Sequence, residues 1–142
     1  MEITIAPMTI ESYDEVFALW QQTEGVGLSS ADSKESICSF LEKNPGLSFV
    51  ASTTGRIIGT ALSGHDGRRG YIYHLTVHPD YRRRGLGREL VDHCLLALKE
   101  VGMQKCHLFV FQSNASGIAF WKSIRWTLRS DIQAMSMTIE SK

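Results

Sequence analysis

The spacing of apolar residues predicts a short strand and two helices over the first 46 positions. Residues 1–6 alternate apolar and polar side chains, which is a strand pattern. Apolar residues then recur every three or four positions, first after Ser12 and again from residue 32 or 33, as on one face of a helix. Ser12 and Glu15 fit a capping box, and the Gly- and Ser-rich residues 23–33 predict a loop between the helices.

From residue 47 onward the pattern changes to that of strands. Residues 47–53 and 56–64 predict two strands joined as a hairpin at Thr54-Gly55. Residues 71–77 predict a third strand, because they are rich in aromatic and β-branched side chains.

The remaining sequence alternates helical and strand patterns. A stripe of apolar residues that starts at Leu86 predicts a helix, and Gly102 is expected to end it. Residues 106–111 predict a buried strand, and a shorter helix is expected after Asn114. Residues 126–140 predict a last pair of strands.

Together these elements predict an α/β (α+β) fold, in which helices cover both faces of a mixed sheet. A helix separates the strands at 71–77 and 106–111, so we expect them to be parallel neighbours joined by a right-handed crossover. Open α/β sheets bind ligands at the carboxyl ends of their strands, and the segment after Val77 lies at such an end. The chain has no repeats and no low-complexity linker, so we expect one domain over residues 1–142.

Composition narrows the class of partner. The 142 residues carry 15 Lys and Arg against 15 Asp and Glu, and this balance argues against nucleic acid as a partner. The three cysteines have no C-x-x-C spacing, which indicates reduced, packed thiols. The first residues contain neither a basic signal region nor an apolar run of membrane-spanning length. We therefore expect a cytoplasmic protein without a membrane partner.

Positive charge is nevertheless concentrated in HPDYRRRGLGREL, residues 78–90. Backbone N–H groups at the start of a helix have no internal partners, and glycines let these groups approach a ligand closely. Together with four arginines they predict a pyrophosphate site, for which a solvated turn is the alternative. The segment lacks the G-x-x-x-x-G-K-[ST] and G-x-G-x-x-G patterns of other phosphate-binding loops.

Three motifs make the chain resemble the GNAT superfamily of acetyl-CoA-dependent N-acetyltransferases, in particular its small bacterial single-domain members. RRRGLG at 82–87 matches the family signature [Q/R]-x-x-G-x-[G/A]. YIYHLTVHP at 71–79 is similar to the fourth strand of the family, and NASGIAFWKSIRW at 114–126 is similar to a later segment. The resemblance implies a GNAT-like mixed central sheet of six to seven strands, in which two splayed parallel strands form the cofactor cleft.

The resemblance also implies how acetyl-CoA binds before CoA leaves as product. Backbone groups of β-strand residues would bind pantetheine, and the amide of Leu75 would also polarise the thioester carbonyl. Arginines and loop amides would hold the pyrophosphate, and Arg83 or Arg84 is a candidate to reach the 3′-phosphate instead. Asn114 would bind the cofactor arm, with a helix cap as its alternative or additional role. The implied cofactor-binding residues are Leu75, Thr76, Val77, Arg82, Arg83, Arg84, Gly85, Leu86, Gly87, Arg88, Asn114 and Trp121.

Direct attack on acetyl-CoA needs a neutral amine, and a primary amine is mostly protonated at pH 7. His74 and Glu24 are the candidate catalytic bases, and the alternatives for them are a packed histidine and a solvated loop glutamate. Trp121 stands where the family has a tyrosine that protonates the leaving thiolate. We therefore expect Trp121 to line the cofactor channel, and Tyr71, Tyr73 or solvent to supply the proton.

Two further features bear on the fold and on the acceptor. Arg125 stands where the family has a glycine that ends a helix in a left-handed backbone conformation. A non-glycine residue in that conformation destabilises the fold by roughly 1–2 kcal/mol. Glu24 and Asp32 favour a cationic acceptor, such as a small amine, an aminoglycoside or a peptide N-terminus.

The first functional hypothesis is an acetyl-CoA-dependent N-acetyltransferase that acts on an unidentified small-molecule or peptide amine. The second is an acyl-CoA-binding sensor without turnover, which the missing tyrosine keeps open. Only the enzyme releases CoA when it is offered the right amine. The quaternary state is left open between a monomer and a homodimer.

Overall fold

The computed structural model describes residues 2–140, so Met1 of the first predicted strand lies outside the described residues. The chain divides into two compact units, one up to Phe109 and one from Val110 on, and each is described by itself. One domain over residues 1–142 stays a prediction.

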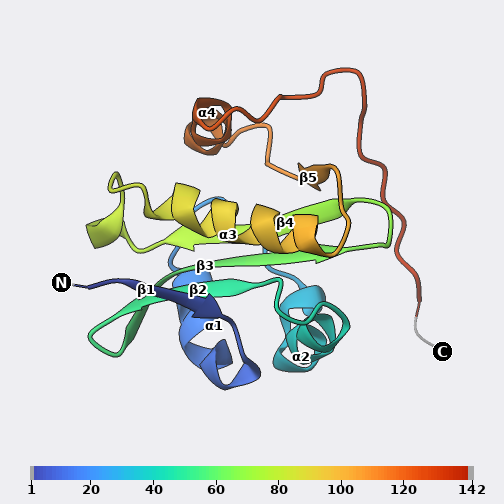
Figure 1. Ribbon diagram of the computed structural model, residues 1–142. Coiled ribbons are helices and arrows are strands. Elements are labelled where there is room, and N and C mark those ends of the chain that lie inside the picture. Colours follow the sequence, from blue (N-terminus) through green and yellow to red (C-terminus); the bar gives the residue numbers. More distant parts are fainter. Residues whose placement is uncertain (1, 141–142) are drawn as a thin grey trace. The chain divides into compact units, whose positions relative to one another are not determined.

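A five-stranded mixed sheet forms the centre of the first unit (Figure 1). Its strands lie side by side in chain order: β1 (Thr4–Pro7), β2 (Phe49–Thr53), β3 (Arg56–His65), β4 (Gly70–Val77) and β5 (Cys106–Leu108). Neighbours from β1 to β4 are antiparallel, and β5 is parallel to β4. The predicted parallel pair is therefore confirmed, and it lies at one edge of the sheet.

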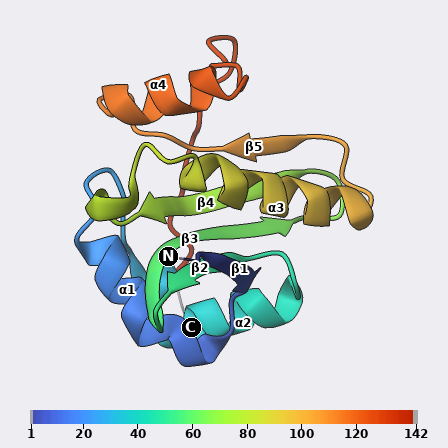
Figure 2. The same cartoon turned by 60° about the vertical axis from the view of Figure 1, so that its left-hand side comes forward.

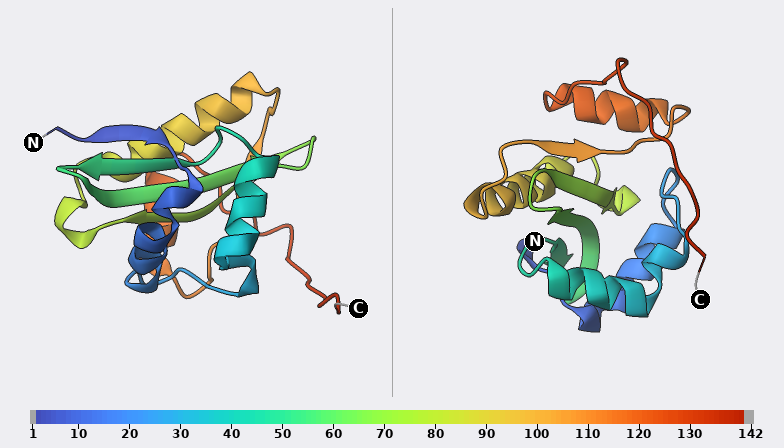
Figure 3. Two further views of the ribbon diagram at one scale, coloured as in Figure 1. Left: turned by 90° about the horizontal axis from the view of Figure 1, so that it is seen from below. Right: turned by 90° about the vertical axis from the view of Figure 1, so that its right-hand side faces the viewer.

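Helices cover both faces of this sheet. The helices of the first unit are α1 (Tyr13–Gln21), α2 (Lys34–Lys43) and α3 (Leu86–Glu100), and its short 3-10 turns are η1 (Ile10–Ser12), η2 (Ser30–Asp32) and η3 (Pro79–Tyr81). Figures 2 and 3 show α1 and α2 on one face and α3 on the other, which agrees with the predicted layers. The second unit contains α4 (Ala115–Ser123).

Each face of the sheet has its own apolar core. On the face of α1 and α2, the buried cluster consists of Met8, Tyr13, Val16, Trp20, Ile37, Val50 and Leu62. On the other face, the predicted stripe of α3 is buried at Leu86, Leu90, Val91, Cys94 and Leu98. Burying one such large apolar side chain contributes about 1.5–3 kcal/mol, so the two cores hold the sheet between the helices.

The cysteines behave as packed thiols. Burial raises the pKa of Cys94 to about 12 and the pKa of Cys106 to about 11. Because the thiolate is the reactive form, these two side chains are unreactive at neutral pH. Cys38 is half-buried, and all three cysteines are free thiols.

The hairpin between β2 and β3 confirms the turn prediction. Thr54 and Gly55 both have positive φ, at 49° and 75°, and Thr53 pairs with Arg56 across them. Two consecutive residues with positive φ are the requirement of a type I′ turn, whose twist matches that of the flanking strands.

The capping-box prediction for α1 is wrong. Ser12 is the N-cap residue, but its backbone is helical and its side chain makes no capping hydrogen bond, because η1 leads directly into the helix. The carboxylate of Glu15 instead accepts a hydrogen bond from the amide of Ile57, at 2.7 Å. Glu15 therefore ties α1 to β3.

The prediction of six to seven strands is also wrong, because the described residues form five. Only Cys106–Leu108 of the predicted strand at 106–111 belongs to the ladder, and residues 126–140 contain no strand. The alternating apolar residues of that last segment are exposed, with Met135 97% and Met137 92% accessible. A strand pattern yields a strand only where a neighbour supplies hydrogen bonds and cover for its apolar face, and the described residues supply neither here.

The end of α4 contains the strained residue that the sequence points to. Arg125 has φ 76°, and its amide donates to the carbonyl of Lys122 while the amide of Trp126 donates to that of Trp121. These two bonds form a Schellman motif, and the Trp121 and Trp126 rings meet edge to face at 4.9 Å. Arg125 thus occupies a left-handed position that favours glycine.

We expect Arg125→Gly to raise the melting temperature by a few degrees, because it removes roughly 1–2 kcal/mol of backbone strain. Thermal unfolding followed by circular dichroism measures the change. The matched control is Gly102→Arg, which introduces the same strain at the equivalent position after α3, where φ is 95°. That control should melt at a lower temperature. An unchanged or lower melting temperature for Arg125→Gly would show that the arginine makes compensating contacts.

Candidate cofactor and active site

The start of α3 presents unpaired backbone donors. Gly85 is the N-cap residue with φ 81°, and the first helical hydrogen bond runs from the amide of Glu89 to the carbonyl of Gly85. Within residues 2–140, the amides of residues 85–88 have no hydrogen-bond acceptor. These donors and the positive end of the helix dipole form a site suited to an anion.

One arginine before α3 has a structural role, and the charges of the next two are not paired with an acidic residue of the described chain. The Nε of Arg82 donates to the carbonyl of Val77 at 2.8 Å, so this side chain fastens the loop to the end of β4. Arg84 lies over the ring of Tyr81 at 5.4 Å from its centroid. Arg83 has φ 63°, and its exposed side chain has no polar partner among the described residues. The charges of Arg83 and Arg84 are therefore available to a ligand.

The end of β4 has an open edge. The parallel ladder with β5 begins at Gly70 and Cys106 and ends at Ile72 and Leu108. Residues 73–77 continue β4, yet within the described chain no strand pairs with them on that side. Leu75 and Val77 are half-buried there and Thr76 is buried. The short ladder and the open edge of β4 fit the expectation that β4 and β5 separate to form a cleft for the cofactor.

His74 lies on this edge in a strained conformation. The register between β3 and β4 shifts between Thr60 and Leu62, so His74 and Leu75 form a bulge opposite one residue of β3. The φ of His74 is 50°, a conformation that costs a non-glycine residue about 1–3 kcal/mol. Strain of this size persists only where the surroundings hold the residue in place.

Two neighbours hold the imidazole of His74. Its Nε2 lies 2.7 Å from Oδ1 of Asp32, and the ring of Trp20 packs edge to face against it with centroids 4.9 Å apart. The His74 side chain is 16% exposed, whereas Asp32 is buried. Sequence reasoning assigned Asp32 to the surface that attracts an acceptor, but the structure places its carboxylate in the interior against His74.

The other predicted site residues lie on other segments of the chain. Glu24 lies in the exposed loop after α1 and has no polar partner in the described part of the chain. Asn114 and Trp121 belong to the second unit. There Oδ1 of Asn114 accepts a hydrogen bond from the amide of Gly117 at 3.0 Å, which confirms its capping role. Trp121 packs against Trp126.

The tyrosines of β4 remain candidate proton donors. Tyr73 stacks with Tyr71 at 6.3 Å between centroids and meets Phe40 edge to face at 6.0 Å. Burial raises the pKa of Tyr73, with smaller contributions from Tyr71, Cys106 and Asp66. Tyr73 therefore keeps its proton throughout the neutral range.

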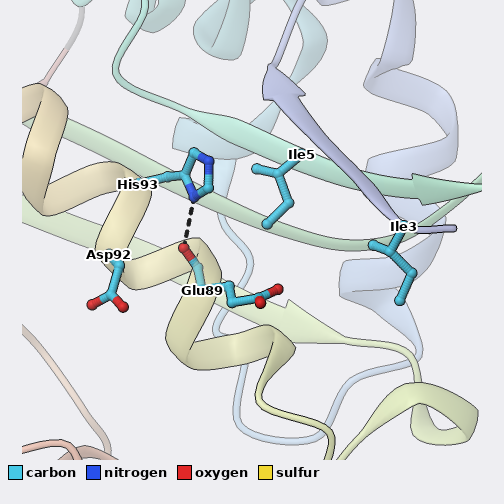
Figure 4. A pocket seen from close by; sticks show the side chains of 5 residues that line it. All are labelled: Ile3, Ile5, Glu89, Asp92 and His93. Carbon is cyan, nitrogen blue, oxygen red and sulfur yellow. Dashed lines mark hydrogen bonds between the residues drawn. The ribbon is translucent and has the colours of Figure 1, made fainter.

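A shallow pocket elsewhere on the first unit lacks the properties of this edge. Figure 4 shows the side chains that line it, those of Ile3, Ile5, Glu89, Asp92 and His93. The volume of the pocket is about 370 Å³. The Nδ1 of His93 donates to the carbonyl of Glu89 within α3, at 2.9 Å. Two carboxylates beside the pocket repel phosphate groups, so this pocket does not suit a phosphorylated cofactor.

Comparisons with known proteins show the family of this chain. The model of the acetyltransferase (GNAT) family matches residues 13–124. The chain belongs to this family. An acetyltransferase of Sodalis glossinidius (strain morsitans) is 30% identical to it over 122 residues, which cover 86% of this chain and 85% of that protein.

Two solved structures show the same fold. Ard1 from Thermoplasma volcanium has a TM-score of 0.80 at 20% identity, and the match covers 92% of this chain and 86% of that one. PaiA N-acetyltransferase from Thermoplasma acidophilum, in complex with coenzyme A, has a TM-score of 0.77 at 19% identity over 91% of this chain and 92% of that one.

The family identifies the protein as an enzyme, an N-acetyltransferase, and supports its use of CoA or acetyl-CoA. The alternative of an acyl-CoA sensor without turnover has no support in these comparisons. Among residues 2–140, no helix has the length and apolar character needed to cross a membrane.

The contact that sequence reasoning missed is the pairing of Asp32 with His74, which lie 42 positions apart. The one local signal is the spacing of Ser29 and Asp32 at the start of a helical turn. The Oγ of Ser29 accepts from the amide of Ala31 at 3.1 Å, and Oδ2 of Asp32 accepts from the amide of Ser29 at 2.9 Å. That signal places Asp32 at a cap, but it does not say what else the carboxylate meets.

We expect Thr76→Val to raise the free energy of unfolding by about 1 kcal/mol, because Oγ1 of Thr76 is buried without a hydrogen-bond partner. Denaturant unfolding measures this change. Thr76 is implied to bind the cofactor through its backbone, so the thermal shift caused by CoA should not change.

The matched control is Thr60→Val on the strand partner of Thr76. The buried hydroxyl of Thr60 donates to the carbonyl of Phe49 at 3.0 Å, so its loss should destabilise the protein. A loss of stability in Thr76→Val as large as that of the control would show that the Thr76 hydroxyl has a partner.

Proposed function

We propose that the protein transfers the acetyl group of acetyl-CoA to a primary amine of a small molecule or peptide by direct attack, with CoA as product. Acetyl-CoA supplies an acetyl group activated as a thioester. One observation carries the proposal: the open edge of β4, with His74 on it, leads through a short loop into the unpaired amides at the start of α3.

The loop and the start of α3 supply the phosphate site. The amides of residues 85–88 donate to the pyrophosphate oxygens, and Arg83, Arg84 and Arg88 neutralise its charge. Arg82 holds the loop against β4 through the carbonyl of Val77. Either Arg83 or Arg84 is in addition a candidate for the 3′-phosphate.

The open edge of β4 supplies the site for the cofactor arm. Backbone groups of Leu75, Thr76 and Val77 bind the pantetheine, as the family resemblance implies. The same resemblance assigns Asn114 to the arm and Trp121 to the channel wall. Because Oδ1 of Asn114 is occupied by its helix cap, the Nδ2 group is the part of this side chain that donates to the ligand.

The catalytic groups are His74 and the amide of Leu75. His74 accepts the proton that the amine loses as it attacks the acetyl carbon. The amide of Leu75 donates to the acetyl oxygen, on which negative charge develops. The leaving thiolate takes a proton from solvent, Tyr71 or Tyr73, and it needs little help because thiols ionise only modestly above neutral pH. Glu24 is the second candidate base.

We expect Gly85→Asp to abolish the thermal shift that acetyl-CoA, CoA and ADP cause in the wild type, because a carboxylate then faces the phosphate site. A ligand at a hundred times its Kd adds about 2.7 kcal/mol of stability, a shift that differential scanning fluorimetry detects. A Cβ at Gly85 meets no other atom within 4 Å, but the φ of 81° strains any non-glycine residue by roughly 1–2 kcal/mol. The shift of each variant is therefore measured from its own melting temperature without ligand.

The matched control is Gly67→Asp, in the turn between β3 and β4, where φ is 89° and the space is equally open. This control should keep the full shift. Equal shifts in the wild type and Gly85→Asp would place the phosphates elsewhere, and no shift in the wild type would overturn the proposed function.

We expect His74→Gln to lower kcat by about 10²- to 10⁴-fold, the usual contribution of a general base, and to leave the CoA-induced thermal shift unchanged. The assay measures CoA release with a panel of polyamines, aminoglycosides and peptides with free N-termini. Glu24→Gln is the comparison variant and should retain the wild-type rate. The reverse pattern would make Glu24 the base.

A further inference from the structure

The carboxylate of Asp32 is held by two donors, one on each oxygen. Oδ1 lies 2.7 Å from Nε2 of His74, and Oδ2 accepts from the amide of Ser29 at 2.9 Å. The hydroxyl of Tyr13 donates to the backbone carbonyl of Asp32 at 2.6 Å, which fastens η2 to α1. Asp32 is 5% exposed, so its position is set by protein contacts.

An ionised carboxylate only accepts hydrogen bonds, so the bond to Asp32 requires the proton of a neutral His74 to be on Nε2. The lone pair of the imidazole is then on Nδ1. Throughout the described chain no donor or acceptor bonds to Nδ1, and the side chain of His74 is 16% exposed. The nitrogen that is free to accept a proton is therefore Nδ1.

We propose that Asp32 is a positioning residue that holds His74 in the Nε2-protonated tautomer and thereby makes Nδ1 the base of the reaction. The inference rests on the proposed function, in which His74 accepts the proton of the amine. After that transfer both ring nitrogens carry protons, and the buried carboxylate stabilises the positive imidazolium without itself becoming protonated.

The surroundings restrict the ring to this arrangement. The ring of Trp20 contacts the imidazole edge to face, with centroids 4.9 Å apart, and the backbone of His74 is left-handed at φ 50°. Trp20 is 1% exposed and packs within the core cluster, so the wall that it forms beside the imidazole is set by the fold. Asp32, which comes from η2, is the anion that meets the ring.

The first measurement is the pair of ring ¹⁵N resonances of His74 in the wild type above pH 7, without any ligand. A protonated Nε2 and an unprotonated Nδ1 support the proposal. The opposite tautomer, or rapid exchange between both, overturns it. Because no cofactor or amine is present, this result does not depend on whether the acetyltransferase reaction has been found.

The second measurement uses Asp32→Asn. An asparagine has one acceptor oxygen and an NH₂ group, so it cannot accept from both Ser29 and His74. The expected result is a shift of the proton of His74 to Nδ1 and a loss of kcat of about 10²- to 10⁴-fold, with KM and the CoA-induced thermal shift unchanged. A folded Asp32→Asn variant that keeps kcat, or that loses it with an unchanged tautomer, overturns the proposal.

Tyr13→Phe is the matched control, because it removes a hydrogen bond to Asp32 without touching the carboxylate. It should lower the melting temperature while keeping the tautomer and kcat. A loss of kcat in this control as large as that in Asp32→Asn would show that any loosening of η2 stops the reaction, which overturns a specific role for the carboxylate. If the wild type acetylates no amine of the panel, the proposed function fails, and the ring resonances still decide the tautomer.

Discussion

The parallel ladder between β4 and β5 is only three residue pairs long, and the candidate site depends on that limit. A longer ladder would use the backbone groups of residues 73–77 for pairing and would leave none for a ligand. Because the two strands part after Ile72 and Leu108, β4 keeps one paired edge toward β3 and one open edge. The open edge of β4 is followed by η3 and then by the start of α3. Free backbone donors of a strand and of a helix end therefore follow one another closely along the chain.

Charge in this protein is arranged locally rather than over the whole surface. The chain has no net charge, yet four arginines and the free amides of residues 85–88 surround the start of α3. One of these arginines is used to fasten the loop, which leaves the others free to neutralise a bound anion. The carboxylates of Glu89 and Asp92 lie by a separate pocket, where they disfavour phosphate.

Backbone strain is placed where a local motif or the site requires it. Outside glycine, positive φ occurs in the described residues at Thr54, His74, Arg83 and Arg125. Thr54 belongs to a hairpin turn and Arg125 to a helix end, so both are explained by local geometry. His74 lies in the open part of β4 and Arg83 in the loop after it. The strain at His74 is offset by contacts such as its bond to Asp32.

The sequence by itself predicted the order of the strands and helices up to residue 123, the helices on both faces of the sheet and the hairpin at Thr54-Gly55, because these depend on local periodicity and turn chemistry. The phosphate site at residues 78–90 stays a prediction. It also identified Arg125 as a residue at a glycine position. Only the tertiary structure decided that residues 126–140 form no strand, and that Asp32 faces His74 rather than the surface. Both depend on partners distant in the chain: a strand needs a neighbouring edge, and a buried carboxylate needs donors that folding brings to it.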